Sequence, residues 1–377
     1  MILVLNTGSS SIKFSLFDAS LAEALSGIAE EIGGAARLTV DGVTQDQPLP
    51  DHAAALQAIF TALEARGIAL ATLSAVAHRV VHGGAHFNAP CRITANSLAA
   101  IEAAAPLAPL HSPPMLAAIR AVTAIAPDLA QTASFDTSFH ATVPDVAARY
   151  ALPPEAEALG LRRYGFHGNS FASLVETLPK LSGAPLPTRL LALHLGNGAS
   201  LCAIREGQSV ATTMGYSPLS GLTMGTRTGD IDGNAVLRLA EAHGIDGAEA
   251  LLNRKSGLIG LGGHSDMRAL LADDTPQARF AIAHFRYWVI RHAGSMIAAM
   301  GGLDAVAFTG GIGEHDPDSR AAICDGLGWL GVSIDREANA SGGSALHAAD
   351  SDIPIWIVPA EEERQIAQDA LGVLGTV

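Results

Sequence analysis

Short apolar runs separated by glycine- and serine-rich turns open the chain. Ile2–Leu5 predicts a buried strand, Thr7–Ser11 a turn, and Ile12–Phe17 a second strand with alternating side chains. The same layout recurs at Arg189–Arg205, where an apolar run leads through a turn at His194–Ala199 into another strand. We interpret these two hairpins as an internal duplication, with one hairpin opening each half of the molecule.

Helical periodicity and further apolar runs fill the segments between the hairpins. Asp51 is expected to cap a helix that ends before Gly67, and Pro113-Pro114 to open a helix over Met115–Ala126. Thr275-Pro276 begins a long helical stretch that ends at Gly301-Gly302. Because strands and helices are mixed, the pattern predicts an α/β fold. The further strands are expected at Ala75–Val81, Ala130–Phe135, Ala305–Phe308 and Ile353–Val358.

The division between the halves is predicted near Asp136–Pro144, without a Pro/Ser-rich linker. The last predicted helix, Glu361–Leu374, is expected to pack back on the N-terminal half. A chain of 377 residues typically forms about two domains.

Composition narrows the class of protein. Apolar residues make up 49% and charged residues 16% of the chain, which excludes intrinsic disorder. The net charge is −14, so nucleic-acid binding is not expected, because it needs a concentrated basic surface. The three cysteines, Cys91, Cys202 and Cys324, have neither disulfide-framework nor zinc-knuckle spacing and fit a reducing cytosol. No apolar run reaches the length of a membrane span or forms a signal peptide, so we expect a cytoplasmic protein.

Glycine-rich turns are the first candidates for chemistry. Walker A and GxGxxG motifs are missing, so a nucleotide would have to bind in another way. The hairpin tips Asn6–Lys13 and His194–Gly198 offer backbone N–H groups and close approach, and together they favour a phosphate clamp over two plain turns. A third cluster, Thr309–Glu314, follows an apolar strand and suits the approach of a flat ligand such as adenosine.

Charged residues in unusual surroundings form the second group. Arg79 lies inside a strand-like run and Arg227 between glycines, which suggests fixed guanidinium groups that grip anions rather than solvated side chains. His111, His167 and His194 are better explained as hydrogen-bond donors to an oxyanion than as zinc ligands, because HExxH spacing is missing. Asp136 follows a strand and could cap a helix or hold Mg²⁺, and Glu361–Glu363 could simply be acidic residues at a helix start.

Eight segments follow one another along nearly the whole chain: Val4–Lys13, His78–Gly84, Phe135–His140, Arg163–Gly168, His194–Gly198, Met214–Asp232, Phe308–Glu314 and Val358–Glu363. Together they resemble the acetate kinase family, which belongs with sugar kinases, heat-shock chaperone ATPases and actin. The resemblance implies ATP-dependent phosphorylation of acetate to acetyl phosphate and ADP by direct in-line transfer, with Mg²⁺ as the metal and Mn²⁺ as the alternative. It also implies two related actin-like (ribonuclease H-like) α/β domains around a central cleft, and a homodimer.

The resemblance assigns roles to matching positions. It implies catalytic roles for Asp136, His167 and Arg227, and metal binding by Asn6 and Glu362. Arg79 would bind acetate, and Val81, Leu110, Phe166 and Pro218 would line the pocket for its methyl group. The nucleotide contacts would be Lys13, His194, Leu195, Gly196, Asn197, Gly198, Asp266, Met267, Arg268, Gly311, Ile312, Gly313, Glu314 and His315. The implied domains are residues 1–138, with helix 363–377 packed on them, and 139–362.

The chain departs from the family pattern at Asn169, Phe171, Gly233-Asn234, His315 and Glu361, none of which removes a charged catalytic position. Three other activities stay open: a propionate or, less well supported, butyrate kinase; a catalytically silent ATP-dependent regulator or chaperone-like module; and a His-rich metallohydrolase. We expect small-molecule substrates and neither nucleic-acid nor membrane partners.

Overall fold

The computed structural model describes residues 1–109 and 111–375, so Leu110 and the end of the predicted segment 363–377 lie outside it. Contacts divide the chain into two compact units. The first unit is Met1–Phe139 together with the segment from Glu361 onward, and the second is His140–Ala360. Within the described residues, no helix combines the length and the apolar character needed to cross a membrane.

The first unit is built on an eight-stranded sheet with the order β5-β4-β3-β2-β1-β6-β8-β7. Strands β1 and β2 form the predicted antiparallel hairpin, and β6 and β8 continue the sheet in parallel with β1. The strands are β1 (Ile2–Thr7), β2 (Ile12–Phe17), β3 (Glu23–Glu30), β4 (Arg37–Val40), β5 (Val43–Asp46), β6 (Ala75–Val80), β7 (Cys91–Arg92) and β8 (Gln131–Phe135).

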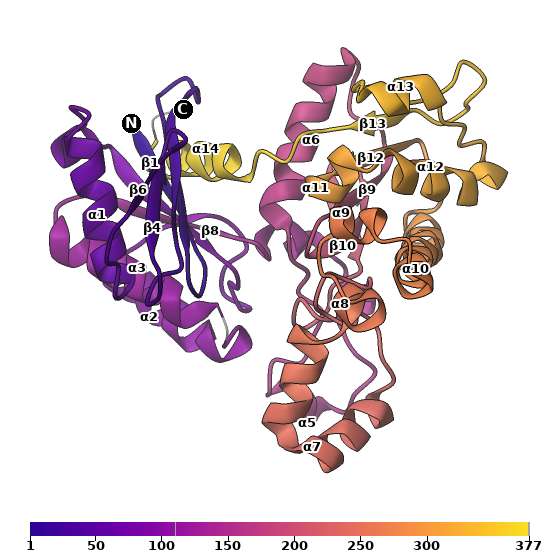
Figure 1. Ribbon diagram of the computed structural model, residues 1–377, viewed down its shortest axis with the longest axis horizontal. Helices are drawn as coiled ribbons and strands as arrows, with labels where there is room; N and C mark the ends of the chain where they lie inside the picture. Colours follow the sequence, from indigo (N-terminus) through magenta and orange to yellow (C-terminus); the bar gives the residue numbers. More distant parts are fainter. Residues whose placement is uncertain (110, 376–377) are drawn as a thin grey trace. The chain divides into compact units, whose positions relative to one another are not determined.

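Helices cover both faces of this sheet, because successive side chains of a strand point to opposite sides. Leu3 and Leu5 of β1 pack into the core shared with α1 and α3, whereas Ile2 and Val4 pack against Ile366 and its neighbours on α14. Figure 1 shows α14 beside β1 and β6. The helices of this unit are α1 (His52–Glu64), η1 (Leu70–Thr72), α2 (Ala95–Ala104), η2 (Ala105–Leu107), α3 (Ser112–Ile125) and α14 (Glu362–Leu374).

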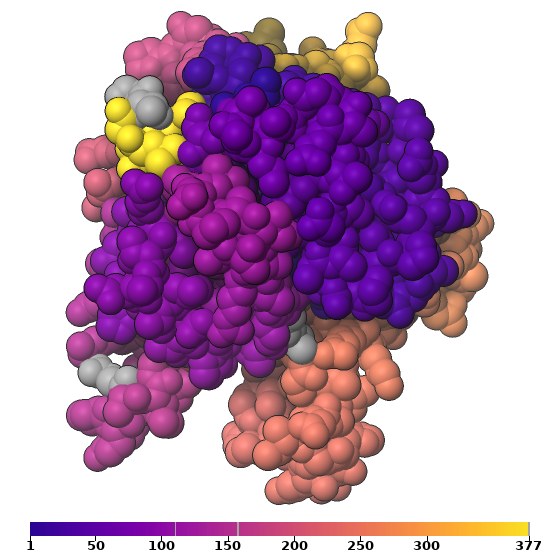
Figure 2. Space-filling view, turned by 90° about the vertical axis from the view of Figure 1, so that its left-hand side faces the viewer, coloured from indigo at the N-terminus to yellow at the C-terminus, as the bar shows by residue number. Residues whose placement is uncertain are grey.

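The predicted helix starts are present in the structure. Asp51 caps α1 by accepting a hydrogen bond from the Ala54 N–H, and α14 packs on the N-terminal unit. In the space-filling view, the yellow C-terminal residues lie against segments from far earlier in the chain (Figure 2). Thr275 caps the long helix α10, which ends at Gly301 in the left-handed conformation.

The second unit repeats the core of the first with a five-stranded sheet, β11-β10-β9-β12-β13. Its β9–β10 hairpin is antiparallel, and β12 and β13 follow in parallel, as β6 and β8 follow β1. The same order and directions in both units confirm the predicted duplication. The strands are β9 (Arg189–Leu195), β10 (Ala199–Arg205), β11 (Gln208–Thr212), β12 (Ala305–Thr309) and β13 (Ile355–Ile357).

Helix α10 packs against β9, β10 and β11, and α6 contacts β9 (Figure 1). The glycine cluster after β12 begins a short helix, α11, rather than an open loop. The helices of this unit are α4 (Asp145–Ala148), α5 (Pro154–Glu157), α6 (Gly168–Ser182), α7 (Gly233–Arg254), α8 (Gly257–Gly262), α9 (Met267–Ala272), α10 (Pro276–Met300), α11 (Gly310–His315), α12 (Pro317–Gly326), η4 (Gly328–Leu330) and α13 (Arg336–Ser341), with η3 (Ser138–Thr142) at the division.

A histidine in the core of the first unit makes stability depend on pH. His78 is 1% exposed and bonds Gln131 at 2.8 Å, and burial lowers its pKa to about 4. In the unfolded chain the His78 ring is protonated below pH 6.5, whereas in the folded chain it is protonated only below about pH 4. The His78 contribution to stability is therefore complete above pH 6.5 and falls by up to about 3 kcal/mol as the pH drops through this window.

We expect His78→Gln to flatten the pH dependence of the urea midpoint between pH 6.5 and 4.5. The matched control is His86→Gln, which changes an exposed histidine of the same unit and should leave the slope unchanged. An identical slope in wild type and the His78 variant would show that His78 does not carry the effect.

Candidate active site

Three parallel strands of the first unit end at the same edge of the sheet and bring a polar cluster together. Asn6 lies near the end of β1, Arg79 near the end of β6, and Asp136 directly after β8. Glu362 begins α14, which packs on these strands. The carboxyl ends of parallel strands are the usual place for a site in such sheets.

Arg79 is the centre of this cluster. Its Nε and Nη2 donate to the two carboxylate oxygens of Asp136 at 2.9 and 2.6 Å, and Nη1 donates to Asn6 Oδ1 at 3.2 Å. The Asp136 side chain is 3% exposed and that of Arg79 is 22% exposed. Burial acts to lower the pKa of Arg79, but Asp136 and Glu362 outweigh it, so the guanidinium stays charged. Three of its five N–H donors are used in these bonds.

Glu362 is a buried carboxyl with charges of both signs around it. Burial raises its pKa to about 7; Arg79 and Lys13 oppose the rise, and Asp136 and Glu363 add to it. In the described part of the chain, no three His, Cys, Asp or Glu side chains are placed to hold a metal ion by themselves. An amide oxygen and a few carboxylates fit a hard cation such as Mg²⁺, which keeps several waters and substrate oxygens.

In the second unit, the turn Gly196–Gly198 lies beside the start of α11. Gly196 N–H donates to Gly198 O at 3.1 Å and closes the turn. Gly310 has φ +77°, and a Cβ there would lie 2.9 Å from Leu195 O, so this position requires glycine. A Cβ at Gly225 would overlap the Asn197 side chain. Glycines therefore let three backbone segments meet at this turn.

Two histidines stack next to this turn. The rings of His167 and His194 have centroids 4.1 Å apart and an interplanar angle of 23°. Ser200 Oγ bonds His167 Nδ1 at 2.9 Å, and Ser170 Oγ bonds His194 Nδ1 at 2.8 Å, which fixes both rings. His167 has φ 59°, a strained conformation that functional residues often adopt. Phe171, at a departure from the family pattern, packs its edge against His194.

Arg227 reaches the same turn from the loop before α7. Its Nη1 donates to Pro218 O at 3.0 Å. A Cβ added at Gly198 would lie 3.2 Å from His167 Nε2 and 3.7 Å from Arg227 Nη1. The structure thus brings together three residues that the sequence placed far apart, His167, His194 and Arg227, at one glycine turn.

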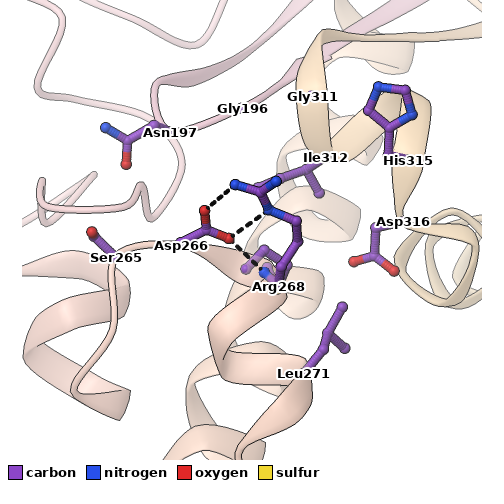
Figure 3. A pocket seen from close by; sticks show the side chains of 11 residues that line it. Gly196, Asn197, Ser265, Asp266, Arg268, Leu271, Gly311, Ile312, His315 and Asp316 are labelled. Atoms are coloured by element: carbon purple, nitrogen blue, oxygen red, sulfur yellow. Dashed lines mark hydrogen bonds and ion pairs between the residues drawn. The ribbon is translucent and has the colours of Figure 1, made fainter.

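A cavity of about 450 Å³ opens beside the turn and is large enough for a nucleoside. Asp266 and Arg268 form an ion pair at 2.7 Å on its wall, and this pairing lowers the pKa of Asp266 to about 2. Figure 3 shows Asn197 and Gly311 toward one side and Leu271 and Asp316 toward the other. The lining residues are Gly196, Asn197, Ser265, Asp266, Met267, Arg268, Leu271, Gly311, Ile312, His315 and Asp316.

Eight of these residues are among the predicted nucleotide contacts; Ser265, Leu271 and Asp316 are additional. Glu314 Oε1 accepts hydrogen bonds from the backbone N–H groups of Gly310 and Ala360, both at 3.0 Å, and so joins the start of α11 to the end of the unit. The predicted contacts that do not line the cavity are His194, Leu195, Gly198, Gly313 and Glu314, and Lys13 belongs to the first unit.

The residues predicted to line the methyl pocket belong to different units. Val81 belongs to the first, whereas Phe166, buried at 2% exposure, and Pro218 belong to the second. Leu110 lies outside the described residues.

The repeated five-strand core is the actin-like kinase fold of two α/β units, with a glycine turn and cavity suited to a nucleotide. The chain belongs to the acetokinase family, whose family model matches residues 1–368. Acetate kinase of Rhodopseudomonas palustris (strain TIE-1) is 44% identical to this chain, and the alignment covers 98% of this chain and 97% of that protein. The protein is therefore a kinase of a family that uses ATP and a divalent metal.

Solved structures agree with this family. Acetate kinase of Porphyromonas gingivalis superimposes with a TM-score of 0.92 at 33% identity, over 99% of each chain. A propionate kinase from Francisella tularensis superimposes with a TM-score of 0.93 at 35% identity, over 98% of each chain.

Proposed function

We propose that this protein transfers a phosphoryl group reversibly between ATP and acetate, with Mg²⁺ as its metal. The observation that carries the proposal is the guanidinium of Arg79, which Asp136 and Asn6 hold through three N–H donors, while its other two donors bond to none of the residues that the structure describes. Those two donors match the two oxygens of a small carboxylate.

The chemistry requires charge neutralisation rather than proton removal. Acetate is already ionised at neutral pH and must approach a triphosphate of the same sign. At an effective dielectric constant of about 20, a unit charge at 4 Å contributes roughly 4 kcal/mol. Arg79 would hold the carboxylate in line, and Arg227 with His167 would donate to the oxygens of the transferring phosphoryl group. His194 and the N–H groups of the turn would hold the nucleotide phosphates.

The metal would be held by Asn6 and Glu362, with Asp136 organising the cluster through Arg79. When bound, Mg²⁺ supplies positive charge to the phosphate oxygens, and Mn²⁺ offers the same ligand chemistry. Asp136 is proposed as an organising group and not as a proton acceptor, because both its oxygens already accept from Arg79.

We expect Glu362→Gln to raise the Mg²⁺ concentration for half-maximal activity by about fivefold or more, because a neutral amide is a weaker ligand for a hard cation. A titration with Mg²⁺ at saturating ATP and acetate measures the change. The control is Glu361→Gln, which alters the neighbouring carboxylate that pairs with Arg364. An unchanged Mg²⁺ requirement in the Glu362 variant would remove this residue from the metal site.

Propionate is the second candidate substrate, favoured by the likeness to the Francisella tularensis propionate kinase. Acetate and propionate differ by one methylene, and a pocket can discriminate such a difference by only about 1–3 kcal/mol. An enzyme that uses one of them is therefore expected to use the other to some extent. A hydroxamate assay of the acyl phosphate, comparing kcat/KM for acetate, propionate and butyrate, tests the proposal. A higher value for propionate would reassign the substrate. No acyl phosphate from any of them would favour a silent ATP-dependent regulator.

We further propose a cytoplasmic homodimer, supported by the family resemblance. Sedimentation of the purified protein tests the dimer.

A further inference from the structure

Asp316 has one carboxylate oxygen that the fold uses and one that it does not. The residue lies between α11 and α12 and is 5% exposed. Its Oδ1 accepts hydrogen bonds from the backbone N–H groups of Asp318 and Ser319, at 3.1 and 3.0 Å, and so caps α12. Its Oδ2 is buried and accepts no hydrogen bond from the described residues. A buried acceptor without a donor lowers the stability of the fold, so the presence of this carboxylate oxygen needs an explanation.

The unused oxygen belongs to a residue of the cavity wall. Figure 3 shows the Asp316 carboxylate on the same side as Leu271, below His315 and away from Asn197. Asp266, the other lining carboxylate, differs because both its oxygens accept from the Arg268 side chain, at 3.2 and 2.7 Å. Asp316 Oδ2 therefore has no donor among the described residues, whereas both oxygens of Asp266 already accept from Arg268.

A buried arginine supports Asp316 without bonding to it. Arg320, 2% exposed, donates to Asn339 Oδ1 at 2.8 Å and to Gly313 O at 3.0 Å. Its positive charge attracts the Asp316 carboxylate, and its bonds join α12 to α11 and α13. The carboxylate is thus held in place before any ligand arrives, which suits a specificity contact.

We propose that Asp316 Oδ2 accepts a hydrogen bond from the 6-amino group of adenine and makes this site select 6-amino purine nucleotides. The inference rests on the proposed nucleotide-binding function. Because phosphates need the N–H groups of the glycine turn at Gly196, we place the base away from that turn, on the side of the cavity where Leu271 and Asp316 lie. A carboxylate there accepts from an amino group and repels a 6-oxo group.

The test compares three triphosphates that differ at position 6 of the base: ATP, purine riboside triphosphate, which lacks the substituent, and inosine triphosphate, which carries an oxygen. In the wild type, we expect kcat/KM to fall about tenfold or more from ATP to each of the other two, because the acceptor is left unsatisfied.

Asp316→Asn is the informative variant, because asparagine also caps helices well. With its oxygen retained at the cap, its NH₂ group takes the place of Oδ2 and donates instead of accepting. We expect the preference for ATP over inosine triphosphate to invert, and ATP and purine riboside triphosphate to become equal within about threefold. The control is Asp335→Asn, at the cap of α13, where Oδ1 also accepts two N–H bonds; its preferences should match the wild type.

Two failures are distinguishable. If no triphosphate supports acyl phosphate formation, the proposed function fails and this inference fails with it. If ATP is used but the wild type does not discriminate at position 6, or Asp316→Asn leaves the discrimination unchanged, only the assignment of Asp316 is overturned. A loss confined to 2′- or 3′-deoxy-ATP would also overturn it, because the donor would then be a ribose hydroxyl. If the variant does not fold, calorimetric binding of the three triphosphates to the wild type decides.

Discussion

Replacing Arg79 with lysine is expected to lower kcat/KM for acetate by about a hundredfold or more, which corresponds to about 2.7 kcal/mol. Lysine carries one nitrogen and cannot donate to both oxygens of Asp136, to Asn6 and to acetate at once. The loss also leaves a carboxylate that is 3% exposed with a poorer partner, and breaking such a buried pair costs about 3–5 kcal/mol. The variant should therefore lose both activity and thermal stability.

Steady-state kinetics with varied acetate, together with a thermal melt, check this expectation. The matched control is Arg37→Lys in the same unit, where the exposed Arg37 side chain pairs with Glu30 at 3.1 Å. Such exposed pairs contribute about 0–1 kcal/mol, so the control should keep its activity and melt within a few degrees of the wild type. An Arg79→Lys protein with kcat/KM within threefold of the wild type would exclude Arg79 as the acetate-binding group.

The hairpins and strand ends could be predicted because they depend on local pattern. The apolar runs of β1, β6, β9 and β12 are buried on both faces, and such runs stand out in a sequence. Strands β3–β5 were not predicted, because β3 mixes exposed and buried positions and β5 is exposed throughout. These strands form by pairing with the edge of a sheet, which leaves little trace in the sequence.

The sequence indicated that Arg79 needs a partner but could not identify it. Asp136 is 57 positions away and becomes the partner only because β6 and β8 pair in parallel. The stacking of His167 on His194 likewise depends on α6 packing beside β9. Asp316 precedes a proline, which marks a helix start, so the sequence indicates a helix cap at this position. It does not indicate that one carboxylate oxygen is left without a hydrogen bond. Nothing in the sequence indicated that Leu271 and Ser265 line the cavity, because a residue of almost any type can line a cavity if the fold places it there.

Replacing Arg227 with lysine is expected to lower kcat by roughly 10- to 100-fold while KM for ATP changes by less than about threefold. The guanidinium is fixed by its bond to Pro218 O and lies near Gly198, where it would contact two oxygens of the transferring phosphoryl group. A lysine supplies the charge but cannot contact both oxygens in a fixed geometry. KM is preserved because Arg227 does not line the cavity.

Initial rates at saturating acetate, with ATP varied, separate the two effects. Arg238→Lys is the control, because Arg238 is a solvated residue of α7 that pairs with Glu241 at 3.1 Å with 78% of its side chain exposed. An interaction made mainly in the transition state lowers kcat and kcat/KM equally, whereas a contact made equally in the ground state raises KM alone. A raised KM with unchanged kcat would therefore make Arg227 a nucleotide-binding residue, and the transition-state charge would then have to be met by the metal and His167.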